Sequence, residues 1–159
     1  MPEVSYSTDP AKLRVVDVLL VEDDPGDVLM TREAFEASRM PGTLHVVGDG
    51  EQAMHFLRRT NDFTGAPRPG LILLDLNLPR RNGLEVLAEL KSDRDLLAIP
   101  VVVFTTSQAE GDILACYRLH ANAYITKPAS FELFTQAIRQ VDDFFLTLAK
   151  LPNLARRPW

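Results

Sequence analysis

Residues 71–83 read LILLDLNLPRRNG, and this stretch decides the fold. Four apolar residues lead directly into one acid, Asp75, and turn-forming residues follow at Pro79 and at Asn82-Gly83. A short continuous apolar run bounded by turn residues is typical of a strand buried on both faces of a parallel sheet. In open α/β sheets, ligands bind outside the carboxyl ends of the strands. Asp75 is therefore either a turn-capping residue, which is common for Asp, or a carboxylate at the mouth of a site.

Composition sets the broad class of the protein. A chain of 159 residues with 46% hydrophobic and 25% charged residues is typical of one globular domain with a substantial core. The net charge of −5 argues against a nucleic-acid or membrane-surface partner. The single cysteine, Cys116, excludes an internal disulfide, and we expect it to be an inert, partly buried thiol. No leader-like start and no long apolar stretch is present, so we expect a soluble, cytoplasmic protein.

The remaining chain predicts strands and helices that alternate. Strands are expected at 15–21, 44–47, 71–74, 101–104 and 123–125, and helices at 25–38, 51–59, 84–90, 112–120 and 130–149. This alternation favours an α/β fold of the flavodoxin-like (βα)5 type, a doubly wound five-stranded parallel sheet in the order 2-1-3-4-5. We expect a flexible N-terminal arm over 1–12, the domain over 13–149, a surface loop over 60–70, and a tail over 150–159 without an output domain.

The predicted strand ends carry a set of polar side chains. Glu22 and Asp23 follow the first strand and Asp75 the third, whereas Thr105 ends the fourth and Lys127 follows the fifth. Since strands 1, 3 and 4 are neighbours in this order, the three carboxylates and the hydroxyl should converge, with the lysine beside them. Clustered carboxylates resist ionisation unless a cation compensates them, and oxygen ligands suit Mg²⁺. The sequence therefore predicts a site for a phosphoryl group joined to a metal ion.

Other polar signals are weaker. The three histidines, His45, His55 and His120, lack metal-ligand spacing, so we expect solvated or capping roles. The two arginines Arg80 and Arg81 lie beside the site, and we expect them to be solvated. The alternative is that they bind an acidic surface of a partner protein.

The segments LLVEDD, LLDLNLP-x-x-NG, VVVFTTS and AYITKP, in this order, resemble the response-regulator receiver domains of two-component signalling. The resemblance covers about residues 16–148, and the intervals of 30 residues from Asp75 to Thr105 and 22 from Thr105 to Lys127 match chemotaxis-type receivers. The PGDVLM start, the TTS triplet and the loop before the central strand are similar to stand-alone receivers paired with bacterial phytochrome histidine kinases. The resemblance implies a signalling protein that catalyses only its own phosphotransfer and autodephosphorylation.

The resemblance assigns the chemistry to particular residues. Asp75 would be the phosphoacceptor for a sensor histidine kinase. Mg²⁺ would be held by Asp23, Asp75 and the backbone carbonyl of Asn77, with Glu22 acting through water. Lys127 would pair with Asp75 and then with a phosphoryl oxygen.

The resemblance also assigns the switch. Thr105 would hydrogen-bond the phosphoryl group and Tyr124 would turn inward behind it, while Asn77, Thr106 and Ser107 would set the phosphate lifetime. The bond between Lys127 and Pro128 would be cis. Thr106 departs from the family pattern, which usually has Ala or Gly there, and the acid pair is Glu-Asp where other members have Asp-Asp.

Three alternatives remain beside this interpretation. An aspartate-nucleophile, Mg²⁺-dependent phosphatase also uses a strand-end Asp, but it needs a second Asp where Asn77 stands. A nucleotide-binding protein would need a glycine-rich first turn. A receiver that never accepts phosphate usually lacks the Asp, the Lys or the acid pair, all of which are present here.

The last predicted helix carries more apolar surface than one sheet face covers. Phe134, Ile138, Val141, Phe145 and Leu148 form the stripe expected to face the sheet, and Phe131, Phe144 and Leu146 fall beyond it. We therefore expect a homodimer through the fourth helix, the fifth strand and the fifth helix, in which the far end of the helix and the tail with Trp159 are covered. The alternative is that the N-terminal arm folds back over them through Val4 and Tyr6.

Overall fold

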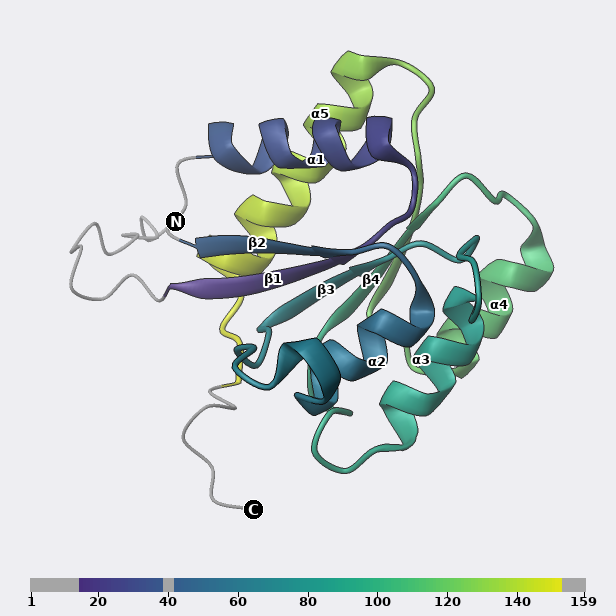
Figure 1. Cartoon of the computed structure of the whole chain (residues 1–159). Helices are drawn as coiled ribbons and strands as arrows, with labels where there is room; N and C mark the ends of the chain where they lie inside the picture. Colours follow the sequence, from purple (N-terminus) through teal and green to yellow (C-terminus); the bar gives the residue numbers. More distant parts are fainter. Residues whose placement is uncertain (1–14, 39–41, 153–159) are drawn as a thin grey trace, which may run out of the picture.

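The computed structural model describes residues 15–38 and 42–152. Five parallel strands form one sheet in the order β2-β1-β3-β4-β5, which confirms the predicted topology (Figure 1). The strands are β1 (Val16–Val21), β2 (Gly42–Val47), β3 (Leu71–Leu74), β4 (Val101–Thr105) and β5 (Ala123–Thr126). The predicted N-terminal arm and the end of the tail, including Val4, Tyr6 and Trp159, lie outside the described residues.

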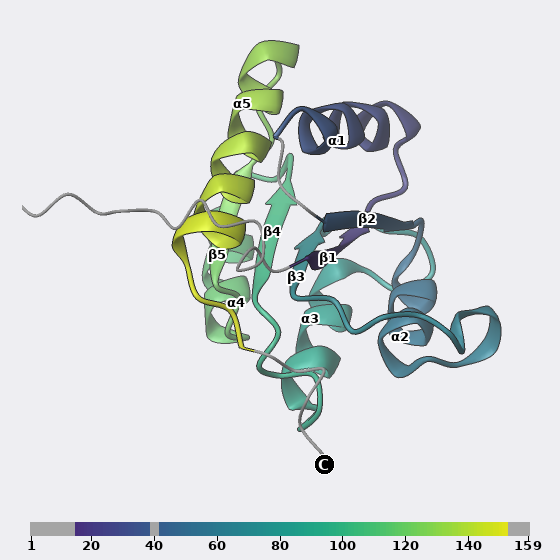
Figure 2. The ribbon, with the colours of Figure 1, turned by 90° about the vertical axis from the view of Figure 1, so that its left-hand side faces the viewer.

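Helices cover both faces of the sheet. Figures 1 and 2 show α1 and α5 on one face and α2, α3 and α4 on the other. Their bounds are α1 (Pro25–Ala37), α2 (Gly50–Arg58), α3 (Gly83–Ser92), α4 (Glu110–Arg118) and α5 (Phe131–Asp142), with short segments η2 (Asn61–Phe63) and η3 (Asp143–Leu148). Two apolar cores result, one on each side of the sheet. This explains why β3 and β4 are buried along their whole length and apolar without alternation.

The helices begin where the sequence provides capping side chains. Asp24 caps α1, in which Pro25 stands at the first position, and Asp49 and Asn82 cap α2 and α3. Ser130 accepts a hydrogen bond from the backbone amide of Leu133 and caps α5, whose start agrees with the predicted helix at 130–149. Each cap starts its helix at a loop that leaves the carboxyl edge of the sheet.

Two expectations about buried side chains are wrong. The apolar spacing within 25–38 predicts that Val28, Leu29 and Phe35 face the core. Leu29 is exposed instead, whereas Phe35 is buried as expected. In α5 the stripe of Phe134, Ile138 and Val141 is buried, but Leu148 is exposed. The reason is that α5 gives way to the π-helical segment η3, whose wider turn changes which side chains face the sheet. Phe145 and Leu146 still pack against the core, whereas Leu148 does not.

Within the described ranges, none of the helices has both the length and the apolar character needed to cross a membrane.

Candidate functional site

The strand register brings the predicted site residues to one edge of the sheet. Val21 of β1 pairs with Leu74 of β3, and Leu74 pairs with Val103 of β4. Hydrogen bonds continue past the strand ends, since the Asp75 amide donates to the Val21 carbonyl at 3.1 Å and the Lys127 amide to the Thr105 carbonyl at 2.7 Å. The backbone of each functional residue is therefore fixed by its neighbouring strand.

The centre of the site is the ammonium group of Lys127. Its nitrogen lies 2.5 Å from a carboxylate oxygen of Glu22, 2.8 Å from one of Asp27 and 3.1 Å from one of Asp75. The Lys127 side chain is 4% exposed, and those of Glu22 and Asp75 are also buried. The single ammonium group thus compensates one carboxylate that follows β1, one in α1 and one that follows β3. The predicted pairing of Lys127 with Asp75 is present.

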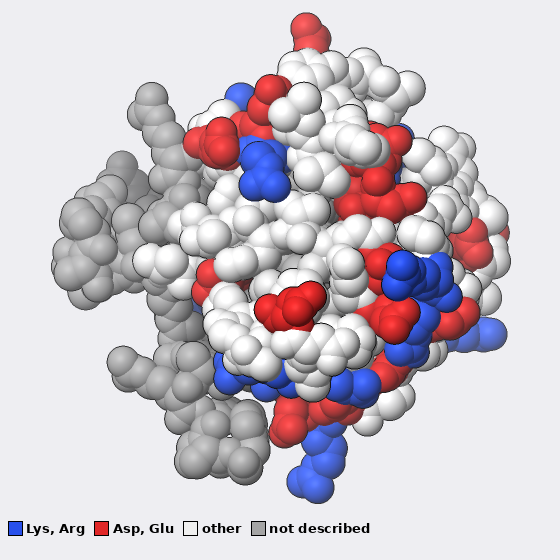
Figure 3. All heavy atoms as spheres, viewed as in Figure 1, with Lys and Arg blue, Asp and Glu red and all other residues white. Residues whose placement is uncertain are grey.

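Glu22, Asp23 and Asp75 also form an acid cluster. Each of the three offers a carboxylate oxygen, and these oxygens lie within 4.8 Å of one another. Asp23 is exposed, while Glu22 and Asp75 are buried. Figure 3 shows acidic side chains gathered near the start of α1, on the side where the strands end. A compact set of oxygen donors, open to solvent at one member, fits a hard divalent cation.

Burial and charge shift the ionisation of the site in opposite directions. Burial raises the pKa of Glu22 to about 7, although the hydrogen bonds from Lys127 and from the Asp24 amide lower it. Burial also works against the charged form of Lys127, but hydrogen bonds to Asp27 and Glu22 outweigh it and raise the pKa of the ammonium. Lys127 is thus held in its charged form.

The predicted switch residues lie on β4, β5 and the loop after β4. Thr105 is fully buried, and its hydroxyl has no hydrogen-bond partner in the described part of the chain. The Tyr124 hydroxyl donates to the Ser107 carbonyl at 2.8 Å, and the ring packs against the apolar core. The Ser107 hydroxyl donates to the Asp112 carboxylate at 2.5 Å, whereas Thr106 is exposed. The Tyr124 side chain thus ties β5 to the loop that begins beside Thr105.

The loop after Asp75 closes tightly over the acceptor. The backbone amide of Asn77 donates to a carboxylate oxygen of Asp75 at 3.2 Å, and the backbone amide of Gly83 donates to the Leu76 carbonyl at 2.9 Å. A Cβ atom at position 83 would collide with the Asp75 carbonyl oxygen, so glycine is required there. Because position 77 carries an amide side chain, the second acid of an aspartate-nucleophile phosphatase is not present.

The bond between Lys127 and Pro128 is trans, so the expected cis bond is wrong; the described residues contain no cis peptide. The trans form is the more stable one for most bonds to proline. Lys127 reaches Asp75 from this backbone without it.

The weaker signals have local explanations. Arg80 lies near Asp49 and Glu51, and Arg81 pairs with Glu89, so both arginines pair with acids of this chain. The three histidines lie outside the acid cluster; His45, for example, contacts Asp17 at 2.9 Å. Cys116 is fully buried, deeper than expected, and burial raises the pKa of its thiol to about 11. Such a thiol is unreactive, as predicted.

Sequence reasoning missed one member of the site, Asp27. It lies in the first turn of α1, and its carboxylate contacts Lys127. The only sequence feature that could have indicated its role is its position three residues after the helix cap Asp24. Acids are common at helix N-termini, so this position did not single out Asp27 as part of the site.

The site defines a class of signalling domain that accepts a phosphoryl group. Its members share a (βα)5 sheet whose carboxyl edge carries a buried aspartate, an acid pair, a buried threonine and a lysine. The sequence model described as the response regulator receiver domain matches residues 18–139. The chain belongs to this family, and the predicted resemblance is confirmed.

Named relatives support the same assignment. The chain is 41% identical to response regulator Rcp1 of Synechocystis sp. over 149 residues, which are 94% of this chain and 99% of that protein. The phosphorylated cyanobacterial phytochrome response regulator RcpA has a TM-score of 0.86 at 45% identity, covering 88% of this chain and 100% of that one. The Mn²⁺-bound form of Rcp1 has a TM-score of 0.84 at 42% identity, covering 86% and 99%.

Proposed function

We propose that this protein is a response regulator that accepts a phosphoryl group on Asp75 from a phytochrome-type sensor histidine kinase. The observation that carries the proposal is the position of Asp75, which lies beside the Lys127 ammonium and within the acid cluster. The similarity to phytochrome response regulators supports the choice of kinase.

The arrangement suits transfer from a phosphohistidine. A carboxylate oxygen of Asp75 forms a bond to phosphorus, the bond from phosphorus to the imidazole nitrogen breaks, and the imidazole keeps the electron pair. Lys127 stabilises the charge on the phosphoryl oxygens, and the Thr105 hydroxyl, which has no described partner, is free to donate to one of them. Water removes the group later, and the protein has no other catalytic activity.

We further propose Mg²⁺ as the cation. Asp23 and Asp75 would supply carboxylate ligands and Glu22 would act through water, since the three acids form the cluster. The Asn77 backbone carbonyl would supply a further oxygen. The bound cation would neutralise charge on the acids and on the phosphoryl group. That Rcp1 binds Mn²⁺ supports a divalent cation of this size and hardness. Thr106 and Ser107 are proposed to adjust the lifetime of the phosphate.

The experiment is intact-mass analysis after treatment with acetyl phosphate and Mg²⁺. We expect one added phosphoryl group on the wild type, none on Asp75→Asn, and full labelling of the control Asp95→Asn, which changes an exposed acid outside the site. A chelator should abolish labelling. Equal labelling of wild type and Asp75→Asn, or labelling that survives chelation, would overturn the proposal.

The kinase is tested separately by phosphotransfer. A purified phytochrome histidine kinase, autophosphorylated with labelled ATP, should pass its label to the wild type within minutes and not to Asp75→Asn. A histidine kinase of unrelated sensory class, tested at the same concentration, should transfer far more slowly. Equal rates from both kinases would contradict the assignment to phytochrome signalling, without affecting the assignment of Asp75.

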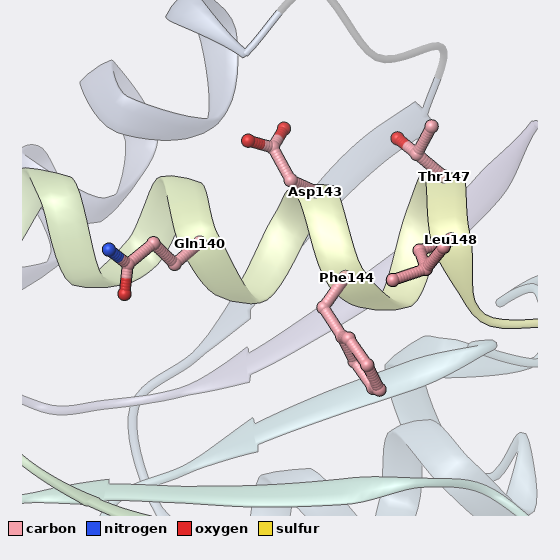
Figure 4. Close-up of a pocket in the computed structure, with 5 residues that line it drawn as sticks. All are labelled: Gln140, Asp143, Phe144, Thr147 and Leu148. Carbon is pink, nitrogen blue, oxygen red and sulfur yellow. The ribbon is translucent and has the colours of Figure 1, made fainter. Parts of the chain in front are cut away.

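We also propose that the protein signals as a homodimer through α4, β5, α5 and η3. Large apolar side chains are exposed on these elements: Leu114 and Tyr117 on α4, Phe131 and Leu133 on α5, and Phe144 and Leu148 on η3. Figure 4 shows Phe144 and Leu148 beside a surface pocket that Gln140, Asp143 and Thr147 also line. A contiguous exposed apolar patch marks an interaction surface, and we propose that these side chains form one.

A further inference from the structure

The ammonium group of Lys127 divides its three hydrogen atoms among three carboxylates of different origin. Glu22 and Asp75 belong to the acid cluster, so both contacts compete with a bound cation or a phosphoryl group. Asp27 does not belong to that cluster and reaches Lys127 from α1. Of the three carboxylates that contact Lys127, Asp27 is therefore the one whose contact does not compete with cation binding or with the phosphoryl group.

The backbone of Asp27 is firmly held. Its amide donates to the Asp24 carboxylate at 2.9 Å, and its carbonyl accepts from the buried Thr31 hydroxyl at 2.8 Å. The side chain is 23% exposed and contacts Lys127 at 2.8 Å. Since Asp24 supplies the helix cap, the Asp27 carboxylate is not needed for that purpose. Its carboxylate contacts Lys127 instead.

Among the described residues, the ammonium without Asp27 would have partners only inside the acid cluster. The contact with Glu22, at 2.5 Å, is shorter than that with Asp75, at 3.1 Å, so Lys127 would move toward Glu22 and away from the acceptor. The preference of the Asp27 carboxylate for charged Lys127 also helps to raise the pKa of the ammonium against its burial. Asp27 thus gives the ammonium a carboxylate partner outside the acid cluster.

We propose that Asp27 is a positioning residue for phosphoryl transfer, which anchors Lys127 from α1 so that one N–H continues to face Asp75. The inference rests on the proposed function, because it assigns a role in that reaction. It adds a fourth carboxylate to the site, one that contacts neither the phosphoryl group nor the cation.

The position of Lys127 is measured directly by ¹H–¹⁵N NMR of lysine ammonium groups in the full-length, metal-free protein. A buried ammonium bonded to three carboxylates exchanges slowly and gives a separate signal. We expect that signal to broaden or disappear in Asp27→Ala and to shift in Asp27→Asn, which keeps an oxygen acceptor but loses the charge. The control Glu33→Gln removes an exposed charge from the same helix and should leave it unchanged. An unchanged Lys127 signal in both Asp27 variants would overturn the proposal.

The second measurement is the initial rate of labelling by acetyl phosphate with Mg²⁺. A displaced catalytic group lowers a rate by one to two orders of magnitude, so we expect Asp27→Ala to be about tenfold slower than wild type. Asp27→Asn should recover most of this loss, and Glu33→Gln should match the wild type. Wild-type rates in Asp27→Ala would refute the role of Asp27. No labelling of the wild type would instead refute the proposed function, while the NMR result still reports on the anchor.

Discussion

The Lys127 ammonium lies 3.1 Å from the Asp75 carboxylate, although β4 separates the strands that these two residues follow. Strands two places apart in a sheet are separated by about 10 Å, which only a long side chain crosses. Lys127 does so above the end of β4, where the buried Thr105 lies. The geometry explains why the residue after β5 is a lysine, and it makes the charge of that lysine important for stability.

Lys127→Met keeps the length of the side chain and removes its charge. Glu22, Asp27 and Asp75 then lose their shared counter-charge, and we expect the free energy of unfolding at pH 8 to fall by about 3–5 kcal/mol. Added Mg²⁺ should restore part of this loss. Urea denaturation with and without Mg²⁺ measures both effects, with the exposed Lys150→Met as the control. Equal stability of Lys127→Met and wild type would contradict the prediction.

The Thr105 hydroxyl is buried without a partner in the described part of the chain, so it has an energetic cost in the unphosphorylated state. Thr105→Val keeps the shape and removes the polar atom, and we expect it to stabilise the fold by about 1 kcal/mol. Chemical denaturation of the unphosphorylated proteins tests this. The exposed Thr106→Val should show no such gain, and a destabilised Thr105→Val would indicate a hidden partner.

Thr105→Ala should still accept phosphate but transmit it poorly. We expect the hydroxyl to sense the phosphoryl group through a hydrogen bond. Without that bond, phosphorylation shifts the population of the protein less strongly from its inactive to its active conformation. Tyr124 reports the change, because its hydroxyl links β5 to Ser107. Amide hydrogen exchange near Tyr124 should differ between the free and phosphorylated wild type and much less in the variant. Equal differences in both proteins would rule out this role.

The Asp142 carboxyl in α5 is fully buried, and neither oxygen has a described partner. Burial, with a smaller effect of Asp143, raises the pKa of Asp142 from 3.8 to about 7. Between pH 3.8 and about pH 7, the Asp142 carboxyl is ionised in the unfolded chain and protonated in the folded protein. The contribution of Asp142 to the free energy of unfolding should therefore be largest below pH 4, fall as pH rises, and level off above about 7.

Asp142→Asn removes this titration, so its stability relative to wild type should rise by about 2–4 kcal/mol between pH 4 and pH 8. Urea denaturation across this range gives the comparison, and Glu132→Gln, at an exposed position of the same helix, serves as the control. Because Glu22 also has a pKa of about 7, only the difference between variant and wild type isolates Asp142. A constant difference across the range would show that Asp142 is ionised throughout.

Much of the fold was predictable because strand burial and chain order determine it. The uninterrupted apolar run 71–74 required covered faces, and the strand ends then required Glu22, Asp75 and Lys127 to converge. The contact between Asp27 and Lys127 was not predictable, because it depends on how α1 is placed over the sheet edge. Burial of Asp142 was equally hidden, since a polar residue after Val141 is expected to face solvent.

The proposed homodimer depends on the exposed apolar side chains of η3. The full chain should sediment as a dimer at micromolar concentration, and a version ending at Asp143 should be a monomer, because it lacks the exposed Phe144 and Leu148. The double variant Phe144→Ser with Leu148→Ser keeps the rest of the chain and should weaken association similarly. Leu97→Ser removes an exposed leucine before β4 and should leave the dimer intact. If the full chain is a monomer both with and without phosphate, the dimer proposal is wrong. If only the truncated form dissociates and the double variant does not, the contact lies in the tail beyond η3.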